Sequence, residues 1–513
     1  MTRRASSPER VRLAALCLAL FTAYTCYAWV RHSHYLTTGF DLGIFDQVTR
    51  DYAGFRAPIV TLKGPGYNLL GDHFHPFIAL WAPLYWVWAD PRMLLAAQAA
   101  LVAASVVPVV RFARRRLGPG GALTVGACYG LSWPLQRMIQ FDVHEIAFAV
   151  PLIAVVIDQL DLARAGERAG TAGGAVAGFD PRRYRWVAVA CLALLGVRED
   201  MGAFVVLVAA LVALRRPWPW QPGGWRGLDG RRGGWQRWAV AGGLGLAGVA
   251  GYELATAVVI PRFSGGAGFV YWTFPALGPD PVSAARFALT QPWSVLRLMV
   301  TPWVKAHTLL ALGLPTLYLG LASRYLLLAA PVLAQRMLNE RELLWTTNFH
   351  YSSVLAPILV MAAVDTLGRL SPVRWTHGWA PRAWLVWCVA VVAFNMVTVS
   401  GDYSLSKMLT SRFWARDARV ASIAEALPRI PDGVCIEADN TIAPQLTGRD
   451  TVFRVGRSDE QASWLVLDVT RDDTGWQGTS PAVAYEQALA RGFTVVWARD
   501  AVVLMSRPGP ACR

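Results

Sequence analysis

Two carboxylates stand close together in residues 39–47, directly after the first apolar segment of the chain. Gly39 and Gly43 permit tight backbone geometry, and the residues around them are apolar enough to bury the neighbourhood. A carboxylate in such surroundings has a raised proton affinity and can act as a general base. Asp41 and Asp46 are therefore the candidate catalytic residues. Asp41 could equally cap a short helix that follows it, and the residues alone leave both roles open.

Further acidic, basic and imidazole groups recur at later points of the chain. We predict that they bind the substrate or its phosphate: Asp72, His73, His75, Asp142, His144, Glu145, Arg198, Glu199, Asp200, His350 and Tyr351. Two imidazoles at positions i and i+2 could also hold a metal, but this spacing is not a zinc signature, which favours a structural or phosphate-binding role. Charged groups at turns between spans are ordinary, so the prediction depends on all of them meeting on one face.

The composition indicates a polytopic membrane protein. The 513 residues are 54% hydrophobic and 16% charged, with 23 Trp, and the mean hydropathy is +0.35. Soluble proteins carry about 25% charged residues. The formal net charge of +15 comes from arginines in short gaps between apolar runs, which is typical of topology signals and not of nucleic-acid binding. We therefore predict a lipid bilayer as partner and no nucleic acid.

Arginine placement predicts the orientation of the chain in the cytoplasmic membrane. With the N-terminus in the cytoplasm, residues 1–400 form a multi-pass, all-α bundle of about eleven crossings. Two large loops, residues 31–91 and 261–302, then lie outside, with residues 77–89 as an interfacial helix. This orientation brings every candidate residue above to the extracytoplasmic side, although neither hydropathy nor arginine counting uses the histidines and carboxylates among them.

The tail, residues 401–513, is predicted to be a small extracytoplasmic α/β domain. Short apolar runs at 434–437, 464–469, 493–498 and 501–505 indicate strands, and helical patterns occupy 415–427 and 481–491. Of the 7 Cys, only Cys435 and Cys512 could meet outside the apolar runs. A bridge between these two is possible, but we expect unpaired thiols. The sequence makes no prediction of the oligomeric state.

Several of these motifs resemble a known family. They are the residues 40–47, the run Gly-Asp-His-Phe-His-Pro at 71–76, Arg-Glu-Asp at 198–200 and His-Tyr-Ser at 350–352. They resemble the prokaryotic predicted membrane proteins catalogued as domain of unknown function 2079, over about residues 20–470. That family in turn is similar to the C-type-fold glycosyltransferases, which use lipid-phosphate sugar donors.

The resemblance implies a catalytic acid in the first outer loop, where Asp41 matches best and Asp46 is the reserve. It also implies a polyprenyl-phosphate-linked sugar as donor; most such enzymes need no metal, although some use a divalent one. The leading hypothesis is a glycosyltransferase acting on the outer face of the membrane. One alternative is a transporter or flippase in which Asp41, Asp142 and Glu253 form a path. Another alternative is a non-catalytic membrane scaffold that displays the tail.

Overall fold

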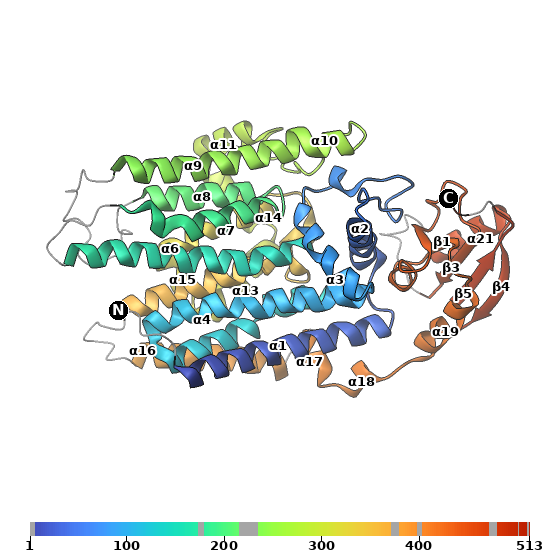
Figure 1. Ribbon diagram of the computed structural model, residues 1–513, viewed down its shortest axis with the longest axis horizontal. Helices are drawn as coiled ribbons and strands as arrows, with labels where there is room; N and C mark the ends of the chain where they lie inside the picture. The colour runs from blue at the N-terminus through green and yellow to red at the C-terminus, as the bar shows by residue number, and fades with distance from the viewer. Residues whose placement is uncertain are drawn as a thin grey trace.

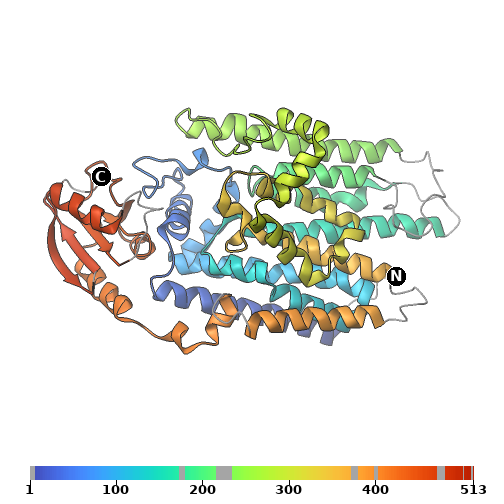
Figure 2. The same ribbon diagram turned by 180° about the vertical axis from the view of Figure 1, so that it is seen from behind.

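Long helices lie side by side in one bundle, and a small sheet domain sits at one end of it (Figure 1). The computed structural model describes residues 6–172, 179–214, 234–370, 379–397, 403–470, 480–500, 502–509 and 512. Seen from behind, the N-terminus lies at the end of the bundle remote from the sheet (Figure 2). The predicted boundary between bundle and tail, at residues 400 and 401, falls outside the described residues.

The bundle is built from apolar helices that satisfy their own backbone hydrogen bonds, as a bilayer requires. Its main members are α1 (Ser7–Ser33), α4 (Pro91–Gly130), α5 (Trp133–Gln140), α6 (Ala149–Ala172), α7 (Arg185–Leu195), α8 (Met201–Ala213), α9 (Gly234–Glu253), α13 (Trp303–Gly313), α14 (Ala330–Met337), α15 (Leu355–Leu370) and α16 (Trp379–Val397). The protein is thus a mostly helical, multi-span membrane protein.

Helix α4 is a hairpin of two antiparallel legs. At Gly118 the backbone φ of 72° breaks the helix in a conformation that glycine adopts without strain. The hydroxyls of Ser105 and Tyr129, one on each leg, are 2.9 Å apart. A Cβ on Gly126 would come within 2.4 Å of the Val110 side chain, so the legs pack closely against each other. The chain therefore reverses direction here, as the arginines near residue 115 predict.

An ion-pair network gathers at the end of the bundle remote from the sheet. Arg114, beside the turn of α4, contacts Glu9 of α1 at 2.9 Å. Arg116 contacts Asp161 of α6 at 2.6 Å and Asp365 of α15 at 3.0 Å. Four elements that are far apart in the sequence thus end on the same side. Arginine clustering predicts this common side correctly.

The predicted count of about eleven crossings exceeds the number of helices that meet the length and composition of a span. Among the described residues these are five, or six if the bent pair Pro292–Val300 and Trp303–Thr316 forms one span. The two counts differ partly because some apolar runs, such as Met201–Ala213 and Pro381–Met396, form helices too short to be counted as spans. In addition, the two legs of the α4 hairpin are counted as one helix, Pro91–Gln140, although the sequence predicts two crossings there. The count of eleven stays a prediction.

Short helices occupy the segments predicted as outer loops. Between α1 and α4 lie the π-helical turn η1 (Gly39–Gly43), α2 (Ile44–Ala53), η2 (Leu69–Gly71), η3 (Pro76–Trp81) and α3 (Ala82–Val87). The last two account for the helix expected at 77–89. Residues 261–302 hold most of α10 (Ile260–Phe263), and α11 (Pro281–Thr290) and α12 (Pro292–Val300).

The tail contains a five-stranded mixed sheet. Its strand order is β2-β1-β3-β5-β4, with β1 parallel to β2 and β3, and β5 antiparallel to β3 and β4. The four predicted strands correspond to β1 (Cys435–Ala438), β3 (Trp464–Asp468), β4 (Thr494–Arg499) and β5 (Val502–Ser506); the predicted helices correspond to α19 (Ala418–Ala426) and α21 (Pro481–Ala490). Two short helices, α17 (Ser404–Met408) and α18 (Ser411–Trp414), precede them.

Two features of the tail differ from expectation. Strand β2 (Thr451–Arg454) was not predicted, because four residues with only two apolar side chains give little periodicity. Cys435 and Cys512 form a disulfide, so the expectation of unpaired thiols was wrong. The pairing depends on the last residues of the chain returning to the first strand of the sheet, and spacing along the sequence does not reveal that return.

Candidate active site

Asp41 lies in the π-helical turn η1, which the tail holds in place. The backbone N–H of Gly39 donates to the carbonyl of Asn440 at 2.6 Å, and that of Phe40 donates to the Asn440 side chain at 3.1 Å. A Cβ on Gly39 would come within 2.9 Å of the Ala443 side chain, so only glycine permits this approach. Irregular π-helical turns are frequent at functional sites. The tail thereby positions the candidate catalytic loop.

The Asp41 carboxylate is buried but makes no hydrogen bond with any residue that the structure describes. The residue is 8% exposed, and the only charged or chargeable partner found within salt-bridge distance among the described residues is Nδ1 of His144, at 3.8 Å. Burial raises the pKa of Asp41 well above its ordinary value, and the nearby carboxylates Asp142 and Glu145 raise it further against the opposing effect of Lys63. A carboxylate with these properties is free to accept a proton from an incoming group.

Three buried imidazoles lie around Asp41. The ring of His144 stacks on His350 with centroids 3.6 Å apart, and Phe45 contacts the rings of His75 and His144 at 6.0 and 6.5 Å. Burial lowers the pKa of His144 to about 4 and also lowers the pKa of His75, although nearby carboxylates partly oppose it. One nitrogen on each ring, His75 Nδ1, His144 Nε2 and His350 Nδ1, is buried without a hydrogen-bond partner among the described residues. Buried polar atoms rarely remain unpaired, so these nitrogens point to a ligand.

His73 belongs to a second, charged layer of the site. Its Nδ1 is 2.7 Å from Glu199, which also accepts a hydrogen bond from the backbone N–H of Phe74 at 3.0 Å. Burial disfavours the charged form of His73, but Glu199 outweighs burial and raises the pKa of His73. The ring of Tyr271 stacks on His73 with centroids 3.9 Å apart, and its hydroxyl donates to Asp72 at 2.5 Å.

Cations in this layer are matched by carboxylates. Arg198 contacts Asp200 at 2.5 Å and Glu145 at 3.3 Å, and Lys63 pairs with Asp72. Burial works against the charged form of Arg198, but Asp200 and Glu145 outweigh burial and raise the pKa of the guanidinium. An anionic substrate would therefore have to replace one of these carboxylates as the partner of a cation.

Asp142 and Asp46 are occupied by structural partners. Asp142 accepts from Arg31 at 2.9 Å and from the backbone and hydroxyl of Thr38 at 2.7 and 2.6 Å. Asp46 is 0% exposed and accepts from Arg50 at 2.8 Å and from the Tyr85 hydroxyl at 2.5 Å. These bonds anchor α1 and α2 around η1. Of the two predicted catalytic acids, Asp41 is the one with free acceptor capacity.

The structure brings most of the predicted site residues together. Asp41, His75, His144, His350 and Tyr351 form one layer, since the rings of His350 and Tyr351 are 4.3 Å apart. The charged layer adjoins it through Glu145. Sequence reasoning missed Tyr271, and the run of aromatic residues around it in a glycine-rich loop is the signal that could have found it. It also missed Arg336, which donates to Ser352 at 2.9 Å directly beyond this layer.

Within the described parts of the chain, no three side chains among His, Cys, Asp and Glu are gathered as ligands for one ion. The unpaired imidazole nitrogens suit a neutral donor–acceptor role toward an organic or phosphate ligand.

Comparison with known protein families shows to which family the chain belongs. The family described as Predicted membrane protein (DUF2079) matches residues 31–163 and 174–504. The chain belongs to this family. The resemblance predicted from the motifs is confirmed, and the match extends beyond residue 470 to include β4 and part of β5. Comparison with curated proteins gives no match for this DUF2079 protein.

Several solved structures are similar to this family member. ArnT from Cupriavidus metallidurans in the apo state has a TM-score of 0.51 and 15% identity, covering 95% of this chain and 97% of ArnT. ArnT bound to undecaprenyl phosphate gives a TM-score of 0.49, 14% identity and the same coverages. An oligosaccharyltransferase from Archaeoglobus fulgidus, in the apo form, has a TM-score of 0.38 and 9% identity over 88% of this chain and 69% of that one. The comparison with apo-state ArnT, at 15% identity, shows an ArnT-like fold and nothing beyond the fold.

Proposed function

We propose that this protein is a membrane glycosyltransferase that moves a sugar from a polyprenyl-phosphate donor to an acceptor hydroxyl on the outer face of the cytoplasmic membrane. The observation that carries the proposal is Asp41, a buried carboxylate without a hydrogen-bond donor among the described residues, beside imidazoles with unpaired nitrogens. The ArnT-like fold supports the lipid part of the donor, because ArnT has also been solved with undecaprenyl phosphate.

In the proposed reaction Asp41 acts as a general base. Its carboxylate accepts the proton of the acceptor hydroxyl while the acceptor oxygen forms a bond to the anomeric carbon of the sugar. The bond between that carbon and the phosphate oxygen breaks, and the lipid phosphate leaves with the electron pair. The products of the step are therefore the glycosylated acceptor, protonated Asp41 and the free lipid phosphate.

The departing phosphate needs hydrogen-bond donors, and the cations near Asp41 are already paired. Lys63 and Arg198 are each paired with carboxylates, and His73 is bonded to Glu199. The neutral imidazoles can instead offer N–H groups from their unpaired nitrogens, and Arg198 can exchange one of its two carboxylate partners for phosphate. Preorganised donors of this kind stabilise negative charge as it develops.

The disulfide supports the proposed orientation. Structural disulfides persist in oxidising compartments and are rare in the cytoplasm, so Cys435–Cys512 favours an extracytoplasmic tail. The tail contacts η1 directly, and the ion-pair network with Glu9 lies at the opposite end of the bundle. We therefore propose that the tail and Asp41 lie on the outer side and that the N-terminus lies in the cytoplasm.

The transport alternative draws less support from the same residues. Its path requires Asp41, Asp142 and Glu253 to line one route. Glu253 is exposed at the end of α9, whereas Asp142 is buried and bonded to Arg31. No observation favours transport or a pure scaffold role over the transferase.

A panel assay tests the proposal. Purified protein is reconstituted in vesicles with polyprenyl-phosphate sugars carrying a radiolabel, and transfer to endogenous and added acceptors is measured for wild type and Asp41→Asn. Asp432→Asn is the matched control, because Asp432 is exposed in the tail and its side chain pairs with Arg449 and with no other described residue. We expect transfer by wild type and the control alone. Equal transfer by Asp41→Asn would remove Asp41 as base, and no transfer across a broad panel would favour transport.

A further inference from the structure

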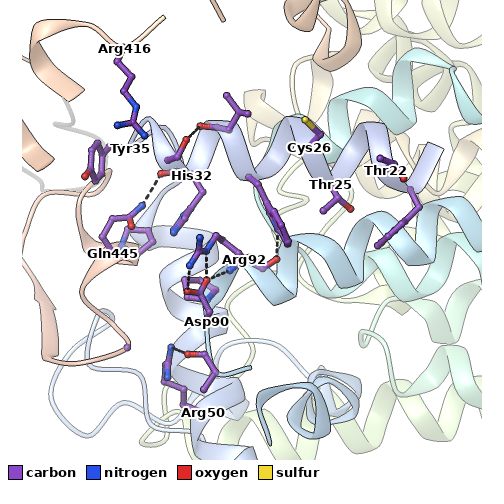
Figure 3. A pocket seen from close by; sticks show the side chains of 18 residues that line it. Thr22, Thr25, Cys26, His32, Tyr35, Arg50, Asp90, Arg92, Arg416 and Gln445 are labelled. Atoms are coloured by element: carbon purple, nitrogen blue, oxygen red, sulfur yellow. Dashed lines mark hydrogen bonds and ion pairs between the residues drawn. The ribbon is translucent and has the colours of Figure 1, made fainter. Parts of the chain in front are cut away.

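A cavity of about 790 Å³ opens on the side of the bundle where α1 meets the tail (Figure 3). Its walls are the outward face of α1, the start of α4 and residues 444–448 of the tail. None of the residues assigned above to the active site lines it. The cavity is therefore a separate feature from the site around Asp41.

Positive charge gathers at the tail end of this cavity. Arg50, Arg92 and Arg416 line it, and Asp90 is the one carboxylate among the lining residues. Arg50 is held by Asp46, and Arg92 by Asp90. Arg416 is exposed and makes no hydrogen bond or ion pair with any residue that the structure describes, although it reaches toward Tyr35 at the cavity mouth (Figure 3). Its guanidinium keeps its full capacity for an anion.

Apolar surface continues from the arginines along α1. Phe21, Cys26, Trp29 and Val30 line this part. From Ser33 to Phe21 is twelve residues, or about 18 Å at 1.5 Å per residue, which is more than half of the hydrocarbon thickness of a bilayer. The cavity thus has a cationic end at the membrane surface and an apolar end within the membrane.

One residue that lines the cavity, Thr25, carries a buried polar atom without a partner among the described residues. The hydroxyl of Thr25, on a residue that is 8% exposed, has no hydrogen-bond partner among the described residues although it could bond within its own helix. Thr25 lies further along α1 than His32, away from Arg416 and toward the apolar part of the cavity (Figure 3). An ester carbonyl there would accept the hydrogen of this hydroxyl.

We propose that this cavity binds an anionic phospholipid of the surrounding bilayer. The phosphate lies between Arg416 and Arg92, the ester groups reach Thr25, and one acyl chain follows α1 toward Phe21. A zwitterionic lipid brings a cationic group to the same arginines and is disfavoured by repulsion. Because the cavity touches both α1 and residues 444–448, the bound lipid fastens the tail to the bundle.

Lipid titration followed by native mass spectrometry tests this site in the full-length protein. Phosphatidylglycerol, phosphatidylcholine and undecaprenyl phosphate are titrated separately into wild type and two variants. Arg416→Glu reverses the charge at the cavity mouth, and Thr22→Trp fills the apolar part. Arg412→Glu and Leu18→Trp are the matched controls, because both positions are exposed and neither lines the cavity. Thermal unfolding of each variant without added lipid verifies that it is folded.

We expect phosphatidylglycerol to bind wild type about tenfold more tightly than phosphatidylcholine, as one charge-assisted contact predicts. Arg416→Glu should lose about tenfold in affinity because that contact is removed, Thr22→Trp should lose about as much because the bulky ring occupies the apolar part, and the controls should not change. The same lipid should raise the unfolding temperature of wild type more than that of Arg416→Glu. Equal affinity for both phospholipids, or unchanged binding by both variants, would overturn the site. Tighter binding of undecaprenyl phosphate that both variants lose would overturn the identity of the lipid. None of these outcomes depends on glycosyl transfer, so they are distinct from a failure of the proposed function.

Discussion

Replacing Asp41 and Asp46 separately by asparagine distinguishes a catalytic carboxylate from a structural one. The two residues are five positions apart in the chain, and both are buried. Their partners differ completely: Asp46 is bonded to Arg50 and Tyr85, whereas Asp41 accepts no hydrogen bond from a described residue. The two variants should therefore fail in opposite ways.

For Asp41→Asn we expect turnover to fall by 10²–10⁴, the usual contribution of a general base, which corresponds to about 3–5 kcal/mol in the activation barrier. Folding stability should not fall. Because the pKa of Asp41 is raised in the folded protein, its ionisation opposes folding as the pH rises from the ordinary value through the raised one. The variant lacks this ionisation, so its advantage in unfolding temperature should grow over that window and vanish below pH 3.8, the ordinary pKa.

For Asp46→Asn we expect the reverse. Removing the negative charge of the fully buried Asp46 leaves Arg50 without its ionic partner. It also weakens the hydrogen bond that the Tyr85 hydroxyl donates to residue 46. Breaking a buried pair costs about 3–5 kcal/mol, and the partial exposure of Arg50 reduces this to about 2–3 kcal/mol. The protein that remains folded should retain most of its turnover per molecule.

The assay measures unfolding temperature in detergent from about pH 3 to pH 9, together with sugar transfer normalised to folded protein. Reduced stability of Asp41→Asn at every pH would show that its carboxylate supports the fold and would refute the reasoning. Loss of turnover in Asp46→Asn that is well folded would indicate that Asp46, and not Asp41, is the catalytic base.

The pair of His73 and Glu199 should give a pH-dependent contribution to stability: the raised pKa of His73 stabilises the fold below pH 6.5, and this stabilisation is lost as the pH rises through the raised value. Glu199→Gln should flatten this decline in thermal unfolding curves, and a slope identical to wild type would exclude the pair as its source. The disulfide predicts that five thiols react with a maleimide in denatured protein without reductant and seven after reduction. Cys512→Ser should lower the unfolding free energy by about 4 kcal/mol, which chemical denaturation of the tail checks, for a loop closed over 77 residues.

The sequence determined the features that depend on local pattern. Apolar runs and arginine clusters predict a multi-span helical protein with Arg114 and Glu9 at a common end, since hydropathy and topology signals are read along the chain. Alternating apolar residues predict strands β1, β3, β4 and β5 within a few residues. The acidic motif around Asp41 identifies the family and the loop that carries the candidate site.

Tertiary structure decided which residues in that loop are free to react. Asp41 and Asp46 look alike in the sequence, and their difference comes from partners such as Tyr85 and His144, which are 39 and 103 positions away from them. The disulfide, the short strand β2 and the cavity beside α1 likewise arise where distant segments meet. Burial and hydrogen bonding depend on which groups pack together in three dimensions, and no local pattern of residue types specifies those neighbours.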